Sequence, residues 1–284
     1  MCDKMKKYLI FTVASLLLMP SCLTKKEKPG ELTRTSGEVK LVTLDPGHFH
    51  AALVQKNSYK QVADEVYVYA PEGDDVQEHL NKINGYNTRT DSPTKWKEVV
   101  YLGSDFLEKM LSEKKGNVMI TAGNNGKKTE YIKQTLMAGI HVLADKPMAI
   151  NSENFGLLKE CFDIARGKGI LLYDIMTERH EITTVLQREL SCIPAVYGEQ
   201  LKGTPEEPAI VKESVHHFFK VVSGTPLKRP AWFFDVNQQG EGIVDVTTHL
   251  VDLVQWEAFP EQVIDYTQDI ELLDANRWTT SISP

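Results

Sequence analysis

The sequence predicts an α/β protein in which a doubly wound parallel sheet is followed by an α+β part. Up to residue 150, short apolar runs alternate with helical segments in the order β-α-β-α-β-α-β-α-β. This alternation implies a parallel sheet with right-handed crossovers. Beyond residue 196 the pattern changes to β-like stretches with glycine- and proline-rich joints. Two domains are therefore expected, at residues 38–175 and 176–284.

The individual elements are predicted from local pattern. Apolar runs rich in β-branched and aromatic residues indicate strands, and capping residues ahead of periodic apolar positions indicate helices. Strands of the parallel sheet are expected at residues 39–44, 65–70, 96–102, 117–122, 141–144 and 169–173. Helices are expected at residues 51–55, 75–83, 129–138, 151–165 and 177–190, with another beginning at residue 104. Further β-like stretches lie at residues 196–202, 210–222 and 263–272.

The first 22 residues have the pattern of an export signal. Three lysines precede an apolar stretch at residues 8–19, and Cys22 follows a small residue. This pattern resembles a bacterial lipoprotein signal, in which Cys22 would carry the lipid and residues 23–37 would be a tether. We expect an exported lipoprotein, anchored to the membrane by this lipid only, that faces the periplasm or the cell surface. An ordinary secretory signal is the alternative.

Composition excludes several other classes. The formal charge is −7 over 284 residues, which gives no electrostatic reason to expect nucleic acid as a partner. After residue 22 no stretch is long and apolar enough to span a bilayer. Besides Cys22, the processed chain would keep Cys161 and Cys192, which do not amount to a disulfide framework.

The first predicted strand is followed by a turn and a helix start, as in dinucleotide-binding proteins. Gly47 suits the tight turn, and the helix N-terminus after it would offer free N–H groups to a phosphate. A three-glycine fingerprint would have glycine at 45, 47 and 50, and only Gly47 is present. Glu72, after the second strand, is the candidate for holding a ribose hydroxyl. The loop residues expected at the cofactor are Gly47, His48, Phe49 and His50.

A lysine follows the fifth predicted strand directly. An unpaired ammonium is costly to bury, so Lys146 is not expected to be a packing residue of the hydrophobic core. Pro147 makes the chain turn there. Ligands of open α/β sheets lie beyond the carboxyl ends of the strands. We therefore expect Lys146 to face a ligand. The polar turn after the fourth strand, Ala122 to Asn125, belongs to the same edge.

A second group of polar residues lies on a predicted helix. Asp245, His249 and Asp252 are four and three positions apart, so they share one helix face. Asp252 is interpreted as structural. His249 can act as a base near neutral pH, and Lys146 can polarise a hydroxyl or carbonyl.

With these motifs the chain resembles the Gfo/Idh/MocA (glucose-fructose oxidoreductase/inositol dehydrogenase) family over residues 38–260, in particular a secreted, Bacteroides-type lipoprotein branch. The stretches that carry the resemblance are Ala138 to Val142 with Asp145-Lys146-Pro147, and Gly240-x-Gly242 with Asp245-x-x-x-His249-x-x-Asp252. The resemblance implies a Rossmann-like domain that binds NAD or NADP, hydride transfer at a carbon of a sugar or sugar derivative, and catalytic roles for Lys146, Asp245 and His249, with His249 held by Asp245. The cofactor-binding residues it implies are Gly47, His48, Phe49, His50, Glu72, Ala122, Gly123, Asn124, Asn125, Asp145, Lys146 and Pro147.

The chain departs from the family pattern in two ways. Lys128 stands where the family has a histidine after the fourth strand. Few residues follow the Asp-x-x-x-His helix, so the second domain's open antiparallel sheet is expected to be incomplete, its edge open to homo-oligomerisation, and the chain alone poorly active.

Other functions remain open. They are an NAD-using glycosidase of the same fold, and a non-catalytic lipoprotein that binds nucleotide or sugar. Less favoured is a metal-dependent hydrolase using His48, His50, His216 and His217. No metal ligand is assigned.

Overall fold

The computed structural model describes residues 35–214, 219–222 and 224–281. The export signal with Cys22, nearly all of the predicted tether, and the pair His216 and His217 lie outside the described residues. Within the described ranges, no helix is long and apolar enough to cross a membrane.

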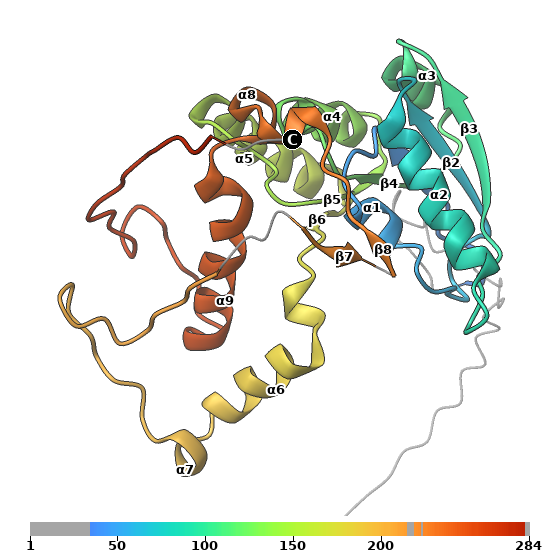
Figure 1. Cartoon of the computed structure of the whole chain (residues 1–284). Coiled ribbons are helices and arrows are strands. Elements are labelled where there is room, and N and C mark those ends of the chain that lie inside the picture. Colours follow the sequence, from blue (N-terminus) through green and yellow to red (C-terminus); the bar gives the residue numbers. More distant parts are fainter. Residues whose placement is uncertain (1–34, 215–218, 223, 282–284) are drawn as a thin grey trace, which may run out of the picture.

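The centre of the molecule is a six-stranded parallel sheet in the order β3-β2-β1-β4-β5-β6 (Figure 1). Its strands are β1 Leu41–Leu44, β2 Glu65–Ala70, β3 Lys97–Leu102, β4 Val118–Thr121, β5 His141–Ala144 and β6 Leu172–Asp174. The strand order reverses between β1 and β4, and in such sheets ligands bind beyond the carboxyl ends at this point. The turns after β1, β2, β4 and β5 therefore meet along one edge.

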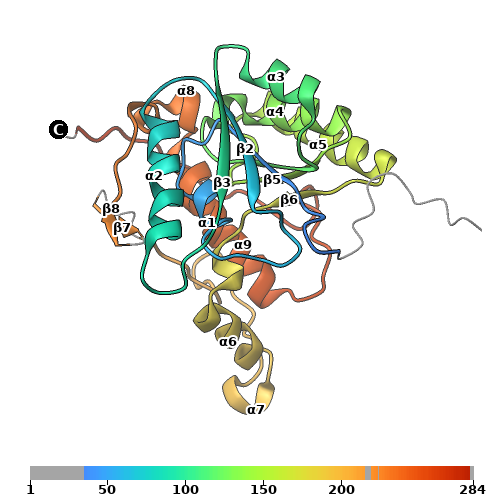
Figure 2. The same ribbon diagram turned by 90° about the vertical axis from the view of Figure 1, so that its right-hand side faces the viewer.

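Helices cover both faces of this sheet (Figure 2). On one face, α3 Phe106–Glu113, α4 Asn125–Met137 and α5 Ser152–Lys168 pack against a buried apolar cluster that includes Met119 and Val142. On the other face lie α1 His50–Leu53 and α2 Asp74–Thr88, whose buried residues join Leu41 and Ile120. Complete burial of a side chain such as Ile120 contributes about 1.5–3 kcal/mol, so the two apolar layers hold the strand ends in place.

The second part of the chain is mainly helical. It comprises η1 Glu178–His180 and η2 Ala231–Phe234 (3-10 helices), α6 Ile182–Ser191, α7 Pro194–Tyr197, α8 Val236–Gln239, η3 Ile243–Thr247 (a π-helix) and α9 Thr248–Ala258. Strands β7 Val221–Val222 and β8 Thr225–Pro226 form a small antiparallel pair. The predicted class, an α/β domain followed by a part with a small antiparallel sheet, is confirmed.

Two predicted strands are wrong. Residues 196–202 contain the end of α7 and then coil, and residues 263–272 form turns and coil. Within the stretch at 210–222 only Val221 and Val222 are in a described strand. The reason is burial: Leu201 is 77% exposed and Val263 95% exposed, so their β propensity has no apolar surface to pack against. The predicted helix at 177–190 is broken into η1 and α6.

Candidate active site

The loop after β1 is pinned to the turn after β4. The backbone N–H groups of Gly47 and His48 both donate to the carbonyl of Ala122, at 2.8 and 2.9 Å. Gly123 has φ +124°, and a Cβ there would lie 2.6 Å from the Gly47 backbone, so only glycine allows this approach. The amides of Gly47 and His48 are therefore not free for a phosphate, and the helix predicted to follow them begins at His50.

Asp45, at the first position of the reduced fingerprint, is a structural acid. It is buried and accepts a hydrogen bond from the hydroxyl of Tyr131 at 3.0 Å and from Asn124 at 3.4 Å. Burial raises the pKa of this carboxyl above its usual value, and the hydrogen bonds oppose that shift. Phe49 lies against the rings of His48 and His50, with centroids 4.4 and 4.5 Å away.

A cavity of about 670 Å³ opens beside this loop. Its walls are the loop after β1, the end of β2 with Glu72, the first turns of α2, and residues 227–233 of the second part. Glu72, the predicted ribose-binding acid, is exposed at this wall. Trp232 donates its indole N–H to Asp75 Oδ2 at 2.7 Å, and its ring occupies the space that a Cβ at Gly47 would need. The second part of the chain thus forms one wall of this cavity.

Lys128 holds the turn that follows β5. Its side chain is fully buried, and its Nζ donates to Asn125 Oδ1 at 2.5 Å and to the main-chain oxygens of Asp145 and Pro147, each at 3.1 Å. Burial lowers the pKa of Lys128 to about 8, so the ammonium form persists at neutral pH. The amide of Asn125 in turn donates to Gln239, which ties this turn to the second part.

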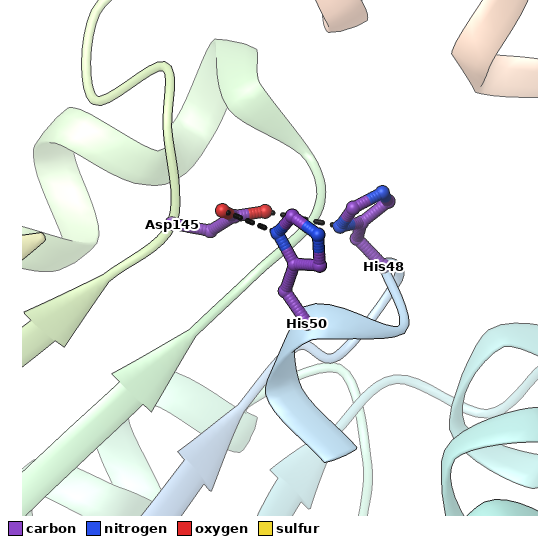
Figure 3. Close-up of side chains that lie close together, drawn as sticks. All are labelled: His48, His50 and Asp145. Carbon is purple, nitrogen blue, oxygen red and sulfur yellow. Dashed lines mark hydrogen bonds and ion pairs between the residues drawn. The ribbon is translucent and has the colours of Figure 1, made fainter. Parts of the chain in front are cut away.

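The carboxylate of Asp145 faces two histidines, His48 in the loop after β1 and His50 at the start of α1 (Figure 3). Nδ1 of His50 lies 2.8 Å from Oδ1, and Nδ1 of His48 lies 3.0 Å from Oδ2. Burial opposes the charge on Asp145, but the two imidazoles outweigh burial and hold its pKa well below the usual range. Burial lowers the pKa of His48 to about 4, so this imidazole is neutral at pH 7.

Lys146 forms an ion pair with Asp245, and both residues were predicted to belong to the same site. Its buried Nζ donates to the main-chain oxygen of Asp245 at 2.8 Å and to Oδ1 at 3.0 Å. Asp245 lies in η3, and both its main-chain oxygen and its carboxylate accept from the same donor. The Lys146–Pro147 peptide bond is cis.

His249 has a different partner from the one expected. Its Nδ1 lies 2.6 Å from Oε2 of Glu178, while Asp245 is engaged by Lys146. Burial opposes the charge on Glu178, but its contact with His249 outweighs burial and lowers the pKa of that carboxyl. Asp252 forms a two-point ion pair with Arg179, in agreement with its structural interpretation. Sequence reasoning missed Glu178 and Arg179, although their place just after the last strand of the sheet was a usable signal.

The matches to known families cover the two parts separately. Residues 48–173 match the model described as "Oxidoreductase family, NAD-binding Rossmann fold". Residues 186–284 match the model described as "Putative oxidoreductase C terminal domain".

The chain belongs to the Gfo/Idh/MocA oxidoreductase family.

Solved structures agree with membership of the Gfo/Idh/MocA family. A structure described as a "putative oxidoreductase" from Parabacteroides merdae is 77% identical with a TM-score of 0.84, and the match covers 89% of this chain and 58% of that one. The fold is shared with an NAD-binding protein from Listeria innocua (17% identity, TM-score 0.51, covering 78% and 55%). It is also shared with a "putative myo-inositol dehydrogenase" from Sinorhizobium meliloti (12%, 0.51, 78% and 56%). The chain thus spans less than two thirds of the length of these proteins. No curated protein matches it.

Proposed function

We propose that the protein is an NAD(P)-dependent oxidoreductase that transfers a hydride at a carbon of a sugar or sugar derivative. The observation that carries the proposal is the buried ammonium of Lys146, held by Asp245 at 2.8 and 3.0 Å. It lies two residues after the end of β5, on the edge where the NAD-binding domain also places Gly123 and the loop after β1. A buried charge at a sheet's ligand-binding edge, with a carboxylate partner, is typical of a catalytic group.

The proposed roles follow from the donors and acceptors present. Lys146 donates a hydrogen bond to the substrate oxygen and stabilises the negative charge that develops when its proton leaves. Asp245 holds Lys146 in position. His249 accepts the hydroxyl proton, and Glu178 on its Nδ1 side orients the ring and stabilises the imidazolium. The bound nicotinamide would accept the hydride from the substrate carbon.

The cavity walls indicate how a dinucleotide would be held. Because the amides of Gly47 and His48 donate to Ala122, they are not available to a pyrophosphate. Lys228 and Arg229 line the cavity from the second part and can supply the positive charge instead. Glu72 suits a free ribose hydroxyl and repels a 2′-phosphate, which favours NAD over NADP.

The substrate class rests on family resemblance, supported by the S. meliloti structure whose description names myo-inositol dehydrogenase. A polyhydroxylated ring offers several hydroxyls to Lys146 and His249. The choice among sugars is left to a substrate screen.

The test has two steps. The protein is denatured and the released material is assayed for nicotinamide absorbance and NAD content; then dehydrogenation of a panel of sugars is followed by NADH formation. Lys146→Met should lower kcat on the order of 100-fold, since it removes one charge-stabilising donor. Lys127→Met, at the exposed neighbour of Lys128 on α4, is the matched control.

Three results would count against the proposal. NAD binding without turnover by any panel member would favour a non-catalytic binding protein. Glycoside cleavage without net NADH formation would favour the NAD-using glycosidase. Full activity of Lys146→Met would remove the lysine from the reaction.

For localisation we propose an exported lipoprotein modified at Cys22. The support is the sequence pattern of residues 1–22. Metabolic labelling with a fatty acid should mark the wild type but not Cys22→Ser, and the wild type should fractionate with membranes. Unlabelled wild-type protein in a soluble extract would contradict the assignment.

A further inference from the structure

We propose that His48, His50 and Asp145 form a binding site for one divalent transition-metal ion. Each of the three residues offers one ligand atom, a ring nitrogen or a carboxylate oxygen, and these atoms all lie within 4.8 Å of one another (Figure 3). His48 comes from the loop after β1, His50 is the first residue of α1, and Asp145 comes from the turn after β5, so distant parts of the chain converge here.

The separations suit ligands of a shared ion. With metal–nitrogen and metal–oxygen bonds of about 2.0–2.2 Å, two ligand atoms on one ion lie roughly 2.8–3.6 Å apart, the shorter values for octahedral and the longer for tetrahedral coordination. The observed distances are 2.8 Å from His50 and 3.0 Å from His48 to their carboxylate oxygens. A small adjustment of the side chains would therefore complete the coordination.

The orientation of His48 is a second, independent observation. Its Nδ1 is buried and lies 3.0 Å from Asp145 Oδ2, yet it has no partner in hydrogen-bond geometry. A nitrogen that donates a hydrogen bond points along the line to its acceptor. A nitrogen that shares an ion with that oxygen points to one side of the line, toward the common centre. His48 matches the second arrangement and His50 the first.

The two neighbouring lysines, Lys128 and Lys146, form their hydrogen bonds with groups other than the carboxylate of Asp145. Lys128 donates to the main-chain oxygen of Asp145 rather than to its side chain, and Lys146 donates to Asp245. The two imidazoles and one carboxylate give a nitrogen-rich set that suits Zn²⁺, Fe²⁺ or Ni²⁺ better than Mg²⁺ or Ca²⁺. His48 lines the nucleotide cavity, so an ion held by the three residues would lie at the cavity wall.

The test uses the full chain after dialysis against a chelator, titrated with Zn²⁺ in a calorimeter. One Zn²⁺ per chain is expected for the wild type. His48→Gln and His50→Gln should each weaken binding by at least about 10-fold, the lower bound for disturbing a metal's surroundings. His180→Gln removes an exposed histidine and is the matched control. A double variant, His216→Gln with His217→Gln, tests the pair outside the described residues. Both controls should bind like the wild type.

Thermal unfolding without Zn²⁺ checks that each variant folds, and Asp145→Asn provides a further arm that keeps the shape but removes the charge. It too should weaken Zn²⁺ binding. A wild type that binds no Zn²⁺, or binds it no better than the His50→Gln and Asp145→Asn variants, would overturn the proposal and leave a purely hydrogen-bonded cluster.

Discussion

Replacing Lys128 by methionine tests whether one buried lysine holds the catalytic turn. Methionine is a similarly long, flexible side chain without the ammonium, so the change mainly removes donors. Three acceptors lose their partner: Asn125 Oδ1 and the main-chain oxygens of Asp145 and Pro147. Two of these oxygens flank Lys146 in the chain, so the turn that presents the proposed catalytic lysine should loosen.

The size of the effect can be worked out from opposing contributions. A buried polar group left without a partner costs about 1–3 kcal/mol, so three acceptors cost roughly 3–9 kcal/mol. Removing the buried ammonium also removes the cost of its desolvation, which offsets part of this loss of stability. Its pKa is lowered from 10.5 to about 8, which corresponds to roughly 3 kcal/mol. The expected net destabilisation is therefore roughly 3 kcal/mol, near the middle of the resulting range.

Urea unfolding followed by circular dichroism measures this difference, with Lys127→Met on the same helix as the control. Lys127 is exposed, so its replacement should change stability by less than about 0.5 kcal/mol. If Lys128→Met unfolds at the same urea concentration as Lys127→Met, the three hydrogen bonds do not hold the turn and the reasoning fails.

Three further predictions concern the cavity and the edge of the sheet. Trp232→Phe keeps an aromatic ring but removes the hydrogen bond to Asp75, so NAD affinity measured by calorimetry should fall about 5- to 10-fold, near 1 kcal/mol; unchanged affinity would show that the bond does not shape the cavity. Glu72→Ser should narrow the preference for NAD over NADP in paired titrations, because it removes the charge facing a 2′-phosphate, and an unaltered ratio would exclude Glu72 from the ribose site. Burial raises the pKa of Glu98 from 4.5 to about 7, so the folded state binds the extra proton and wild-type stability should fall as pH rises from about 4.5 to 7. Glu98→Gln should flatten that part of the stability profile, and an identical slope in both proteins would contradict the assigned cause.

The parallel sheet was predictable because its strands are short apolar runs that the fold buries. Leu44 and Met119 are both fully buried, so local pattern and tertiary environment agree. The strands expected near Leu201 and Val263 were wrong because pattern alone cannot reveal whether another surface will cover a segment.

The site was predictable in part, for a related reason. Lys146 and Asp245 were placed together from family spacing, and the structure joins them directly. The contact between His249 and Glu178 was not predicted. The two residues are far apart in sequence, so no helical or strand periodicity relates them. Nor does a buried lysine such as Lys128 differ in sequence from the exposed Lys127 beside it. Burial is decided by how α4 rotates against the sheet.

Under the proposed function, the wall that residues 227–233 contribute to the cavity makes cofactor binding and domain docking one equilibrium. Trp232 and Arg229 reach the cavity only when the second part is seated on the first. By thermodynamic reciprocity, a ligand that binds the closed cavity more tightly must strengthen that seating by the same factor. The bound cofactor would then stabilise the docking of the second part of the chain on the first. A substitution in the second part that weakens this docking would lower the nucleotide affinity, even at a position distant from the cavity.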